Sequence, residues 1–409
     1  MKYLLIIGDG MADIPVESLG SRTPLETAAK PTIDALSRGG ILGNVVNCPP
    51  PLPSGSETAI LSIFGCDPLK YFTGRSPMEA ASLGIRLNKG DACFRCNLIT
   101  LEEGEIPFEE RKILSHSAGS ITAEEGLEFV KILNADEEFS SALKHIQMEL
   151  PEVPATRPLA VQHNSDYSGC SFIPPHDHLG SKCGAFLPSG TAKAEEYISL
   201  EKLAYRILSS HPLNEKRRSE GKMPANGIWL WAEGTAVSLP GFREQYGCSG
   251  AVISAVPICH GIGVLRGLEK VEVPGATGEI DTNFEGKLEA AWEKINEYDF
   301  ICVHLEAPDE CTHNGDLPGK IQSIAWLDSR ILSPLLSRMD GAGMEYRILL
   351  LSDHKTLTST RGHDGDPVPF LLYDSRVSGG SGKEYTEANG MAGLTVPSGC
   401  KLLDLLFEK

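Results

Sequence analysis

The sequence predicts an α/β protein: a doubly wound, mainly parallel sheet with a smaller α+β domain inserted into it. Three observations lead to this prediction. Towards both ends of the chain, short and nearly continuous apolar runs alternate with helical patterns, which is typical of parallel strands covered by helices on both faces. The middle of the chain lacks this regular alternation. The 409 residues also exceed the usual size of a single compact core.

The first elements follow from apolar runs and the residues at their boundaries. Proline at the first turn and two glycines after the last turn indicate a short helix. The next helix is expected to begin with a capping box, in which Ser54 is the N-cap and Glu57 its reciprocal partner. We therefore expect, in this order, strand 2–7, helix 31–38, strand 45–46 and helix 56–64.

The middle of the chain is expected to form the inserted domain. Strand and helix patterns are mixed there, with acidic helices at residues 123–133 and 195–209. Proline and glycine interrupt the patterns repeatedly. These changes predict an inserted domain at residues 89–225, between two segments of a core domain at residues 1–88 and 226–409.

After the inserted domain the alternation of strands and helices returns. The apolar runs are again nearly continuous, as expected for strands that are buried on both faces. We expect strands at residues 228–231, 251–256, 271–273, 300–305 and 346–352, and helices at 282–297 and 319–338.

Composition limits the class of protein. A hydrophobic content of 41% and a charged content of 22% are typical of a globular protein. The net charge of −18 argues against a nucleic-acid partner, which would require clustered Lys and Arg. No apolar run approaches the roughly 20 residues that cross a bilayer, and the amino-terminal run is too short for a signal peptide. The 11 cysteines form no zinc-ribbon or disulfide framework. We expect a cytoplasmic protein with reduced thiols and no membrane partner.

Three of the apolar strands lead into an aspartate: Asp9, Asp309 and Asp353. In open α/β sheets, ligands bind beyond the carboxyl ends of the strands. Three carboxylates at one edge would repel each other strongly unless cations lay among them. The pattern therefore predicts a metal site.

Histidines accompany these aspartates at useful spacings. His313 lies four residues after Asp309, which places both side chains on one face of a helical turn. His354 follows Asp353 directly, and His363 lies in the loop after it. Asp, His and a serine oxygen suit divalent ions such as Mn²⁺ or Zn²⁺, and Ca²⁺ less well.

Ser56 is the predicted nucleophile. It lies at the first turn of a predicted helix, where free amide N–H groups and the helix dipole favour an alkoxide or a bound phosphate. A purely structural alternative is that Ser54 and Ser56 both cap the helix. Ser54 fits that role better, which leaves Ser56 available for metal-assisted attack.

Several segments together resemble the archaeal-type cofactor-independent phosphoglycerate mutases, a branch of the alkaline phosphatase superfamily, and the resemblance covers essentially the whole chain. It therefore implies an alkaline-phosphatase-like sheet in a metal-binding core domain, and an inserted domain that binds substrate. The segments are GDGM at 8–11, PSGSET at 53–58, YFTGR at 71–75, DECTHNGD at 309–316, DH at 353–354 and HDGDPVP at 363–369.

The resemblance implies two divalent metal ions, with Mn²⁺ favoured and Zn²⁺, Mg²⁺ and Co²⁺ as alternatives. One ion would be held by Asp9, Ser56, Asp353 and His354, and the other by Asp309, His313 and His363. Ser56 would take the phosphate from 3-phosphoglycerate, and the reoriented glycerate would recover it on its 2-hydroxyl. The substrate is thus expected to be a small phosphorylated acid, while the oligomeric state stays open.

Other residues depart from this family and favour alternatives. GKMPANGIWLW at 221–231, VPGATG at 273–278 and FIPPHD at 172–177 resemble a bacterial branch described as proposed homoserine kinases. Residues 115–119 lack the arginines that the family usually carries there, and His260 stands where a lysine is usual. A phosphotransferase for another small molecule, a phosphomonoester hydrolase and a non-catalytic metal-binding protein therefore remain as alternatives.

The remaining candidates are substrate contacts. Arginine binds carboxylate and phosphate through paired hydrogen bonds. The candidate substrate-binding residues are Arg75, Arg95, Arg157, His260 and Lys320.

Overall fold

The computed structural model describes residues 1–408, which divide into two compact units. The core unit contains residues 1–72 and the chain from residue 238 onward, and the inserted unit contains Thr73–Val237. The inserted unit extends beyond the predicted limits, residues 89–225, at both ends. The reason is that α5 (Ser76–Ser82) packs on β3 (Ala92–Leu101), while β7 (Gly227–Thr235) pairs along the same strand.

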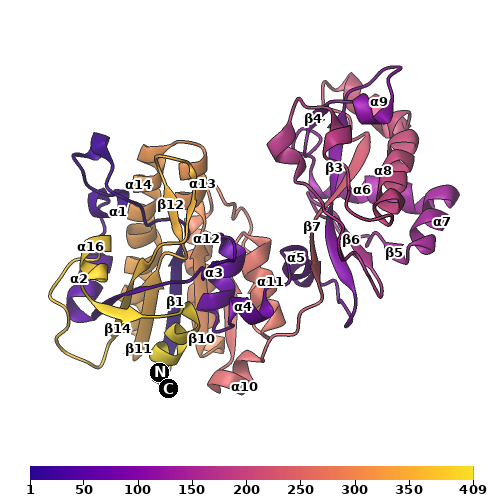
Figure 1. Cartoon of the computed structure of the whole chain (residues 1–409). Helices are drawn as coiled ribbons and strands as arrows, with labels where there is room; N and C mark the ends of the chain where they lie inside the picture. The colour runs from indigo at the N-terminus through magenta and orange to yellow at the C-terminus, as the bar shows by residue number, and fades with distance from the viewer. Residues whose placement is uncertain (409) are drawn as a thin grey trace. The chain divides into compact units, whose positions relative to one another are not determined.

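The core unit contains an eight-stranded sheet (Figure 1). Of these strands, only β14 runs antiparallel to its neighbours, so the predicted mainly parallel sheet is confirmed. The order across the sheet is β15 (Leu394–Val396), β2 (Ile41–Val45), β14 (Val368–Asp374), β11 (Tyr346–Leu351), β1 (Lys2–Gly8), β10 (Phe300–Leu305), β8 (Gly250–Ile253) and β9 (Glu269–Val271).

Helices cover both faces of this sheet. Leu4 and Ile6 pack on one face with α2 (Pro31–Gly39), α12 (Phe284–Glu297), α14 (Leu317–Trp326) and α15 (Ser333–Gly341). Leu5 and Ile7 alternate with them and are equally buried, because successive side chains of a strand point to opposite faces. Two further helices contact strands of this sheet: α11 (Pro257–Leu265) contacts β8, and α17 (Leu402–Leu406) contacts β11.

Short elements complete the core unit. The helix predicted at residues 319–338 is divided, because a π-helical segment at Leu327–Leu332 separates α14 from α15, whose first turn contains a proline without an N–H to donate. The remaining elements are α1 (Pro24–Thr27), α3 (Ser56–Ile63), α4 (Pro68–Tyr71), α10 (Phe242–Tyr246), α13 (Ala307–His313), α16 (Glu387–Met391) and the hairpin β12 (Lys355–Leu357) with β13 (Gly362–Asp364).

The inserted unit has its own antiparallel sheet and its own core, which confirms the predicted α+β character. Phe94, Phe129, Tyr197 and Trp229 are among its fully buried side chains. The sheet contains β4 (Ile113–Ser115), β3, β6 (Leu159–Gln162) and β5 (Met148–Glu149), with β7 paired to β3. The helices that follow α5 are α6 (Ala123–Ala135), α7 (Glu137–His145), α8 (Ala194–Ser209) and α9 (Pro212–Ser219).

Two further observations bear on the class of protein. Cys93 and Cys96 have a C-x-x-C spacing, but they lie on opposite faces of β3 and in different hydrophobic clusters, so they do not form a metal knuckle. Within residues 1–408, no helix has the length and apolarity needed to cross a bilayer.

Candidate metal centre and nucleophile

Three buried aspartates meet at the carboxyl edge of the core sheet. β1 lies between β10 and β11 and runs parallel to both, so the segments after these strands emerge on one side. Asp9 directly follows β1, Asp353 follows β11, and Asp309 lies in α13 after β10. The structure therefore brings together the three aspartates that the sequence singled out.

Histidines join these aspartates in two overlapping groups that share Asp309. The first group is Asp9, Asp309 and His354, and the second is Asp309, His313 and His363. In each group the candidate ligand atoms lie within 4.8 Å of one another. Asp353 adjoins the first group, since its Oδ2 lies 3.3 Å from His354 Nε2.

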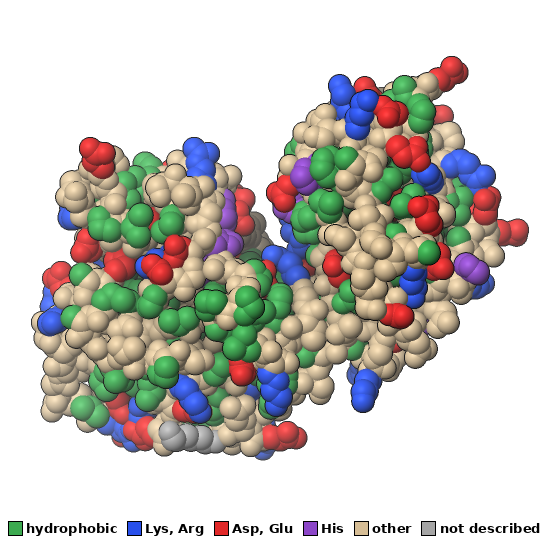
Figure 2. Space-filling view, in the orientation of Figure 1, with side chains coloured by type: hydrophobic (Ala, Val, Ile, Leu, Met, Phe, Trp, Pro, Cys, Tyr) green, Lys and Arg blue, Asp and Glu red, His purple; other side chains and the backbone are tan. Residues whose placement is uncertain are grey.

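The second group combines two residues of one helix with a third residue from a distant part of the chain. In α13, His313 Nε2 lies 3.1 Å from Asp309 Oδ2, as expected for residues four apart on a helix. His363 comes from β13, and its Nε2 lies 2.9 Å from His313 Nε2. Figure 2 shows histidine side chains at the surface of the core unit, at the end where α13 and β12 lie.

Ser56 lies beside the first group. Its Oγ is 3.3 Å from Asp9 Oδ2 and 3.2 Å from His354 Nε2. It is the first residue of α3, but the predicted capping box is wrong. Gly55, not Ser54, occupies the N-cap position, and no side chain caps this helix, because the helix begins one residue later than the box requires.

The carboxyl groups differ in their electrostatics. Burial raises the pKa of Asp9 well above its usual range, and the nearby carboxylates of Asp353 and Asp309 raise it further. Burial also disfavours the charge on Asp309, yet hydrogen bonds from His313 and His363 hold the pKa of that carboxyl well below its usual range. The hydrogen bond to Asp309 raises the pKa of His313 to about 9.

The donor set fits divalent cations. Asp9 Oδ1 and Asp353 Oδ2 are buried and accept no hydrogen bond from residues 1–408. Buried carboxylate oxygens that accept no hydrogen bond are costly, and a cation between them offsets both the desolvation cost and the mutual repulsion. A mixture of carboxylate oxygens and imidazole nitrogens suits Mn²⁺ or Zn²⁺.

His304 is a residue of this site that sequence reasoning missed. It is fully buried on β10, and its Nε2 lies 3.1 Å from Asp9 Oδ2. Its Nδ1 lies 3.0 Å from Glu306 Oε1, and Lys287 Nζ donates to the other oxygen of Glu306 at 2.6 Å. The available signal was a histidine inside an otherwise apolar strand.

Two predicted substrate contacts lie in other surroundings. Lys320 is fully buried, and its Nζ donates to Asp13 Oδ2 at 2.9 Å, so it presents no surface to a substrate. His260, on α11, is only 5% exposed, and burial lowers its pKa to about 4. It is therefore neutral at pH 7 and does not supply the positive charge expected for an anion contact.

The predicted arginines lie in the inserted unit. Arg95 and Arg75 both donate to the buried carboxylate of Glu79, from Nε at 2.8 and 2.9 Å. Burial by itself would raise the pKa of Glu79, but the two guanidinium groups outweigh it and lower this pKa to about 2. The Arg95 guanidinium lies over the Trp231 ring, 4.9 Å from its centroid.

Two histidines that were not predicted as contacts extend this group. The His176 ring lies 5.1 Å from the Trp231 ring and 5.9 Å from the His116 ring. Burial lowers the pKa of His116, and the charges of His176 and Arg157 lower it further. Arg157 is therefore close enough to His116 to interact with it electrostatically. We call Arg75, Arg95, Arg157, His116, His176 and Trp231 the Arg–His cluster.

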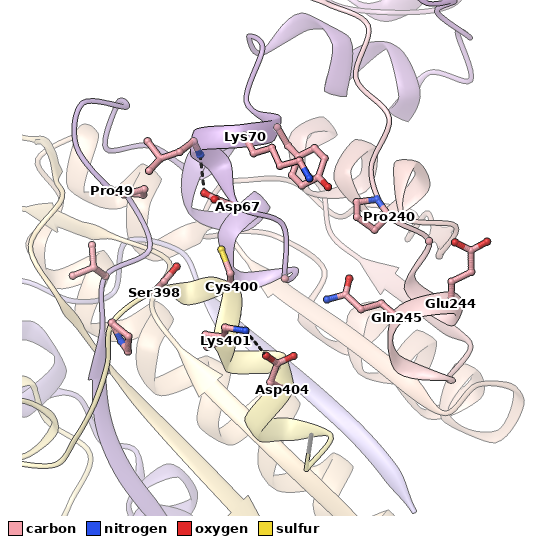
Figure 3. Close-up of a pocket in the computed structure, with 16 residues that line it drawn as sticks. Pro49, Asp67, Lys70, Pro240, Glu244, Gln245, Ser398, Cys400, Lys401 and Asp404 are labelled. Atoms are coloured by element: carbon pink, nitrogen blue, oxygen red, sulfur yellow. Dashed lines mark hydrogen bonds and ion pairs between the residues drawn. The ribbon is translucent and has the colours of Figure 1, made fainter.

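A separate cavity of about 830 Å³ lies in the core unit, and none of the predicted site residues lines it (Figure 3). Its acids are Asp67, Glu244 and Asp404, and its lysines are Lys70 and Lys401. Lys401 Nζ lies 3.1 Å from Asp404 Oδ2. Because acids outnumber bases there, the cavity does not favour a phosphorylated ligand.

The fold and the site define a metal-dependent enzyme, and residues 1–396 match the model of the metalloenzyme superfamily. A curated 2,3-bisphosphoglycerate-independent phosphoglycerate mutase from Methanosarcina acetivorans is 42% identical over 97% of this chain and 98% of its own. A probable enzyme of the same name from Geobacter sulfurreducens is 39% identical over the full length of both chains. The chain therefore belongs to the family of 2,3-bisphosphoglycerate-independent phosphoglycerate mutases.

Solved structures agree with this assignment. The structure of PH0037 protein from Pyrococcus horikoshii superposes with a TM-score of 0.80 at 29% identity, over 100% of this chain and 96% of that one. The cofactor-independent phosphoglycerate mutase from Thermoplasma acidophilum has a TM-score of 0.65 at 26% identity, over 100% and 99% of the two chains.

Proposed function

We propose that this protein interconverts 3-phosphoglycerate and 2-phosphoglycerate through a phosphoserine at Ser56. The observation that carries the proposal is the position of the Ser56 hydroxyl, 3.2 Å from His354 Nε2 and 3.3 Å from Asp9 Oδ2. An activatable hydroxyl has no purpose in a purely structural metal site. The names of the full-length relatives support phosphoglycerate as the substrate.

Two metal ions are part of the proposal. Asp9, Ser56, Asp353 and His354 would hold one ion, and Asp309, His313 and His363 the other. Mn²⁺ is the favoured ion, with Zn²⁺, Mg²⁺ and Co²⁺ as alternatives. When bound, the ions supply electrostatic stabilisation of the charge on the transferring phosphoryl group.

Ser56 performs the transfer in two steps. Its Oγ loses a proton and forms a bond to phosphorus while the bond from phosphorus to the 3-oxygen of the substrate breaks, and that oxygen takes up a proton. The bound glycerate then presents its 2-hydroxyl, which loses a proton and accepts the phosphoryl group, while the bond from phosphorus to Ser56 Oγ breaks and Oγ takes up a proton. The start of α3 favours this chemistry because its free N–H groups and dipole stabilise negative charge.

The Arg–His cluster is the proposed binding site for the carboxylate of the substrate. The protein carries a net charge of −18, so an anionic substrate has to be attracted locally. Arg95 is buried and held by Glu79, which fixes its guanidinium in place. Trp231 Nε1 is buried and donates no hydrogen bond within residues 1–408, so it is available to an acceptor.

A coupled assay tests the function. The purified enzyme, incubated with 3-phosphoglycerate, Mn²⁺ and enolase, is expected to generate phosphoenolpyruvate. The homoserine-kinase and hydrolase alternatives are not favoured by the relatives. Release of inorganic phosphate without phosphoenolpyruvate would support a hydrolase, and phosphate transfer to homoserine alone would support the kinase. The cytoplasmic location and the absence of a nucleic-acid partner stay predictions from the sequence.

A further inference from the structure

Thr356, on β12, contacts two of the candidate metal ligands. Its Oγ1 lies 2.5 Å from Asp309 Oδ1 and 3.2 Å from His354 Nδ1. Asp309 is shared by both groups of candidate ligands, whereas His354 belongs to the group beside Ser56. The side chain of Thr356 is fully buried, so water does not compete for these contacts.

The surrounding chain holds this hydroxyl in place. The Thr356 N–H donates to the carbonyl of Ala12 at 3.2 Å, and its carbonyl accepts from Lys320 Nζ at 2.6 Å. A Cβ added to Gly10 would lie 2.3 Å from Thr356 Oγ1, so the loop after β1 approaches this hydroxyl closely only because residue 10 is a glycine. Lys320 Nζ also donates to Asp13 Oδ2 at 2.9 Å, so it links Thr356 to Asp13.

The donors and acceptors assign the proton positions. An ionised carboxylate only accepts hydrogen bonds, so Thr356 donates its single proton to Asp309. The contact with His354 is then a hydrogen bond only if the proton of the neutral imidazole lies on Nδ1. The Lys355 backbone also bonds to this imidazole. Nε2 is then left with its lone pair, and it lies 3.2 Å from Ser56 Oγ and 3.3 Å from Asp353 Oδ2, where a bound cation would separate it from the carboxylate.

We propose that Thr356 is a positioning residue, whose hydroxyl orients Asp309 and keeps the His354 proton on Nδ1. His354 Nε2 is thereby held ready to bind a cation next to Ser56. The inference rests on the proposed two-metal site and adds to it a residue that contacts neither substrate nor metal. Partners of this kind orient metal ligands and typically affect metal affinity strongly.

Two substitutions and one spectrum test the inference. Thr356→Val removes the hydroxyl and keeps the shape of the side chain, and it is expected to weaken Mn²⁺ binding about 10–100-fold in a calorimetric titration of metal-free enzyme. Thr356→Ser keeps the hydroxyl and is expected to bind Mn²⁺ like the unchanged protein. The ¹⁵N spectrum of the metal-free protein is expected to show His354 protonated on Nδ1, with the signal assigned by its loss in His354→Gln.

The opposite results overturn the inference. They are unchanged Mn²⁺ affinity in Thr356→Val, an equally large loss in Thr356→Ser, or a His354 proton on Nε2 in the unchanged protein. The ¹⁵N spectrum of the unchanged protein tests the inference even if Thr356→Val does not fold. None of these readouts depends on mutase activity, so their failure is distinct from a failure to form phosphoenolpyruvate.

Discussion

Ser56 Oγ lies 3.2 Å from His354 Nε2, although the two residues are 298 positions apart in the chain. Ser56 begins α3, and His354 follows the central strand β11. The contact places a hydroxyl beside an imidazole nitrogen and a buried carboxylate, Asp9. The proposed phosphoryl transfer depends on this arrangement, and the first prediction tests it.

Ser56→Ala is expected to lower kcat by about three orders of magnitude or more, because it removes the hydroxyl that lies beside Asp9 Oδ2 and His354 Nε2. The coupled enolase assay measures the loss. Ser54→Ala is the matched control: it changes a serine of the same loop that neither caps α3 nor contacts Asp9 or His354 in the hydrogen bonds described, and kcat should stay near that of the unchanged enzyme. Substantial turnover by Ser56→Ala would remove Ser56 from the mechanism.

Removal of metal is expected to abolish activity and to lower the thermal midpoint, and the loss of stability should grow as pH rises. Burial and two neighbouring carboxylates raise the folded-state pKa of Asp9 above its unfolded value. The metal-free fold therefore binds protons more tightly than the unfolded chain, so its stability falls as pH rises through the folded pKa. Bound cations remove this penalty.

Thermal melts with and without chelator, over about pH 5 to 8, measure this difference. Because protons compete with metal for the same ligands, the gap between the two midpoints should widen with pH. A constant gap, or one that narrows, would contradict the assignment of Asp9 to the metal site.

Glu79→Gln is expected to destabilise the protein by about 3–5 kcal/mol, because it leaves Arg95 buried without its carboxylate. The pKa of Glu79 is lowered from 4.5 to about 2, so its stabilising contribution is present above pH 4.5 and is lost as pH falls towards 2. Urea denaturation between these pH values measures the effect. Glu128→Gln is the control, since its pair with Lys131 is exposed and should contribute less than about 1 kcal/mol. Equal effects of the two substitutions would contradict the role of Glu79.

His176→Ala is expected to raise KM for 3-phosphoglycerate about tenfold with a smaller change in kcat, because it removes one hydrogen-bond donor to an anionic group. Steady-state kinetics measure both constants. His178→Ala is the matched control from the same short segment, because His178 stacks on Phe186 rather than on Trp231. If His176→Ala leaves KM unchanged, the Arg–His cluster is not the carboxylate site.

Some contacts of the site could be predicted because they are local. The spacing of Asp309 and His313 requires only one helical turn, and α13 supplies it. The strand-end positions of Asp9 and Asp353 follow from apolar runs, and parallel strands carry such residues to one edge. Ser56 is predicted from its place at the first turn of a helix, and the family resemblance then divides the predicted ligands between two metal ions.

Other contacts depend on pairing and burial between distant segments. His304 meets Asp9 because β1 and β10 pair with Ile7 opposite His304, a register that no local pattern encodes. The limits of the inserted unit depend on β7 returning to β3. From the sequence alone Lys320 is a lysine available to bind an anion, and only the folded chain shows that its Nζ is paired with Asp13.

The sequence by itself determined the alternation of strands and helices, the acidic edge of the sheet and the choice of Ser56 as the proposed nucleophile, because these depend on residue type and short spacing. Only the tertiary structure decided which charges are paired and buried. It placed His304 against Asp9 and Thr356 against Asp309, and it buried Lys320 and His260. The physical reason is that charge state and hydrogen bonding depend on neighbours in space, and strand register brings those neighbours together from distant parts of the chain.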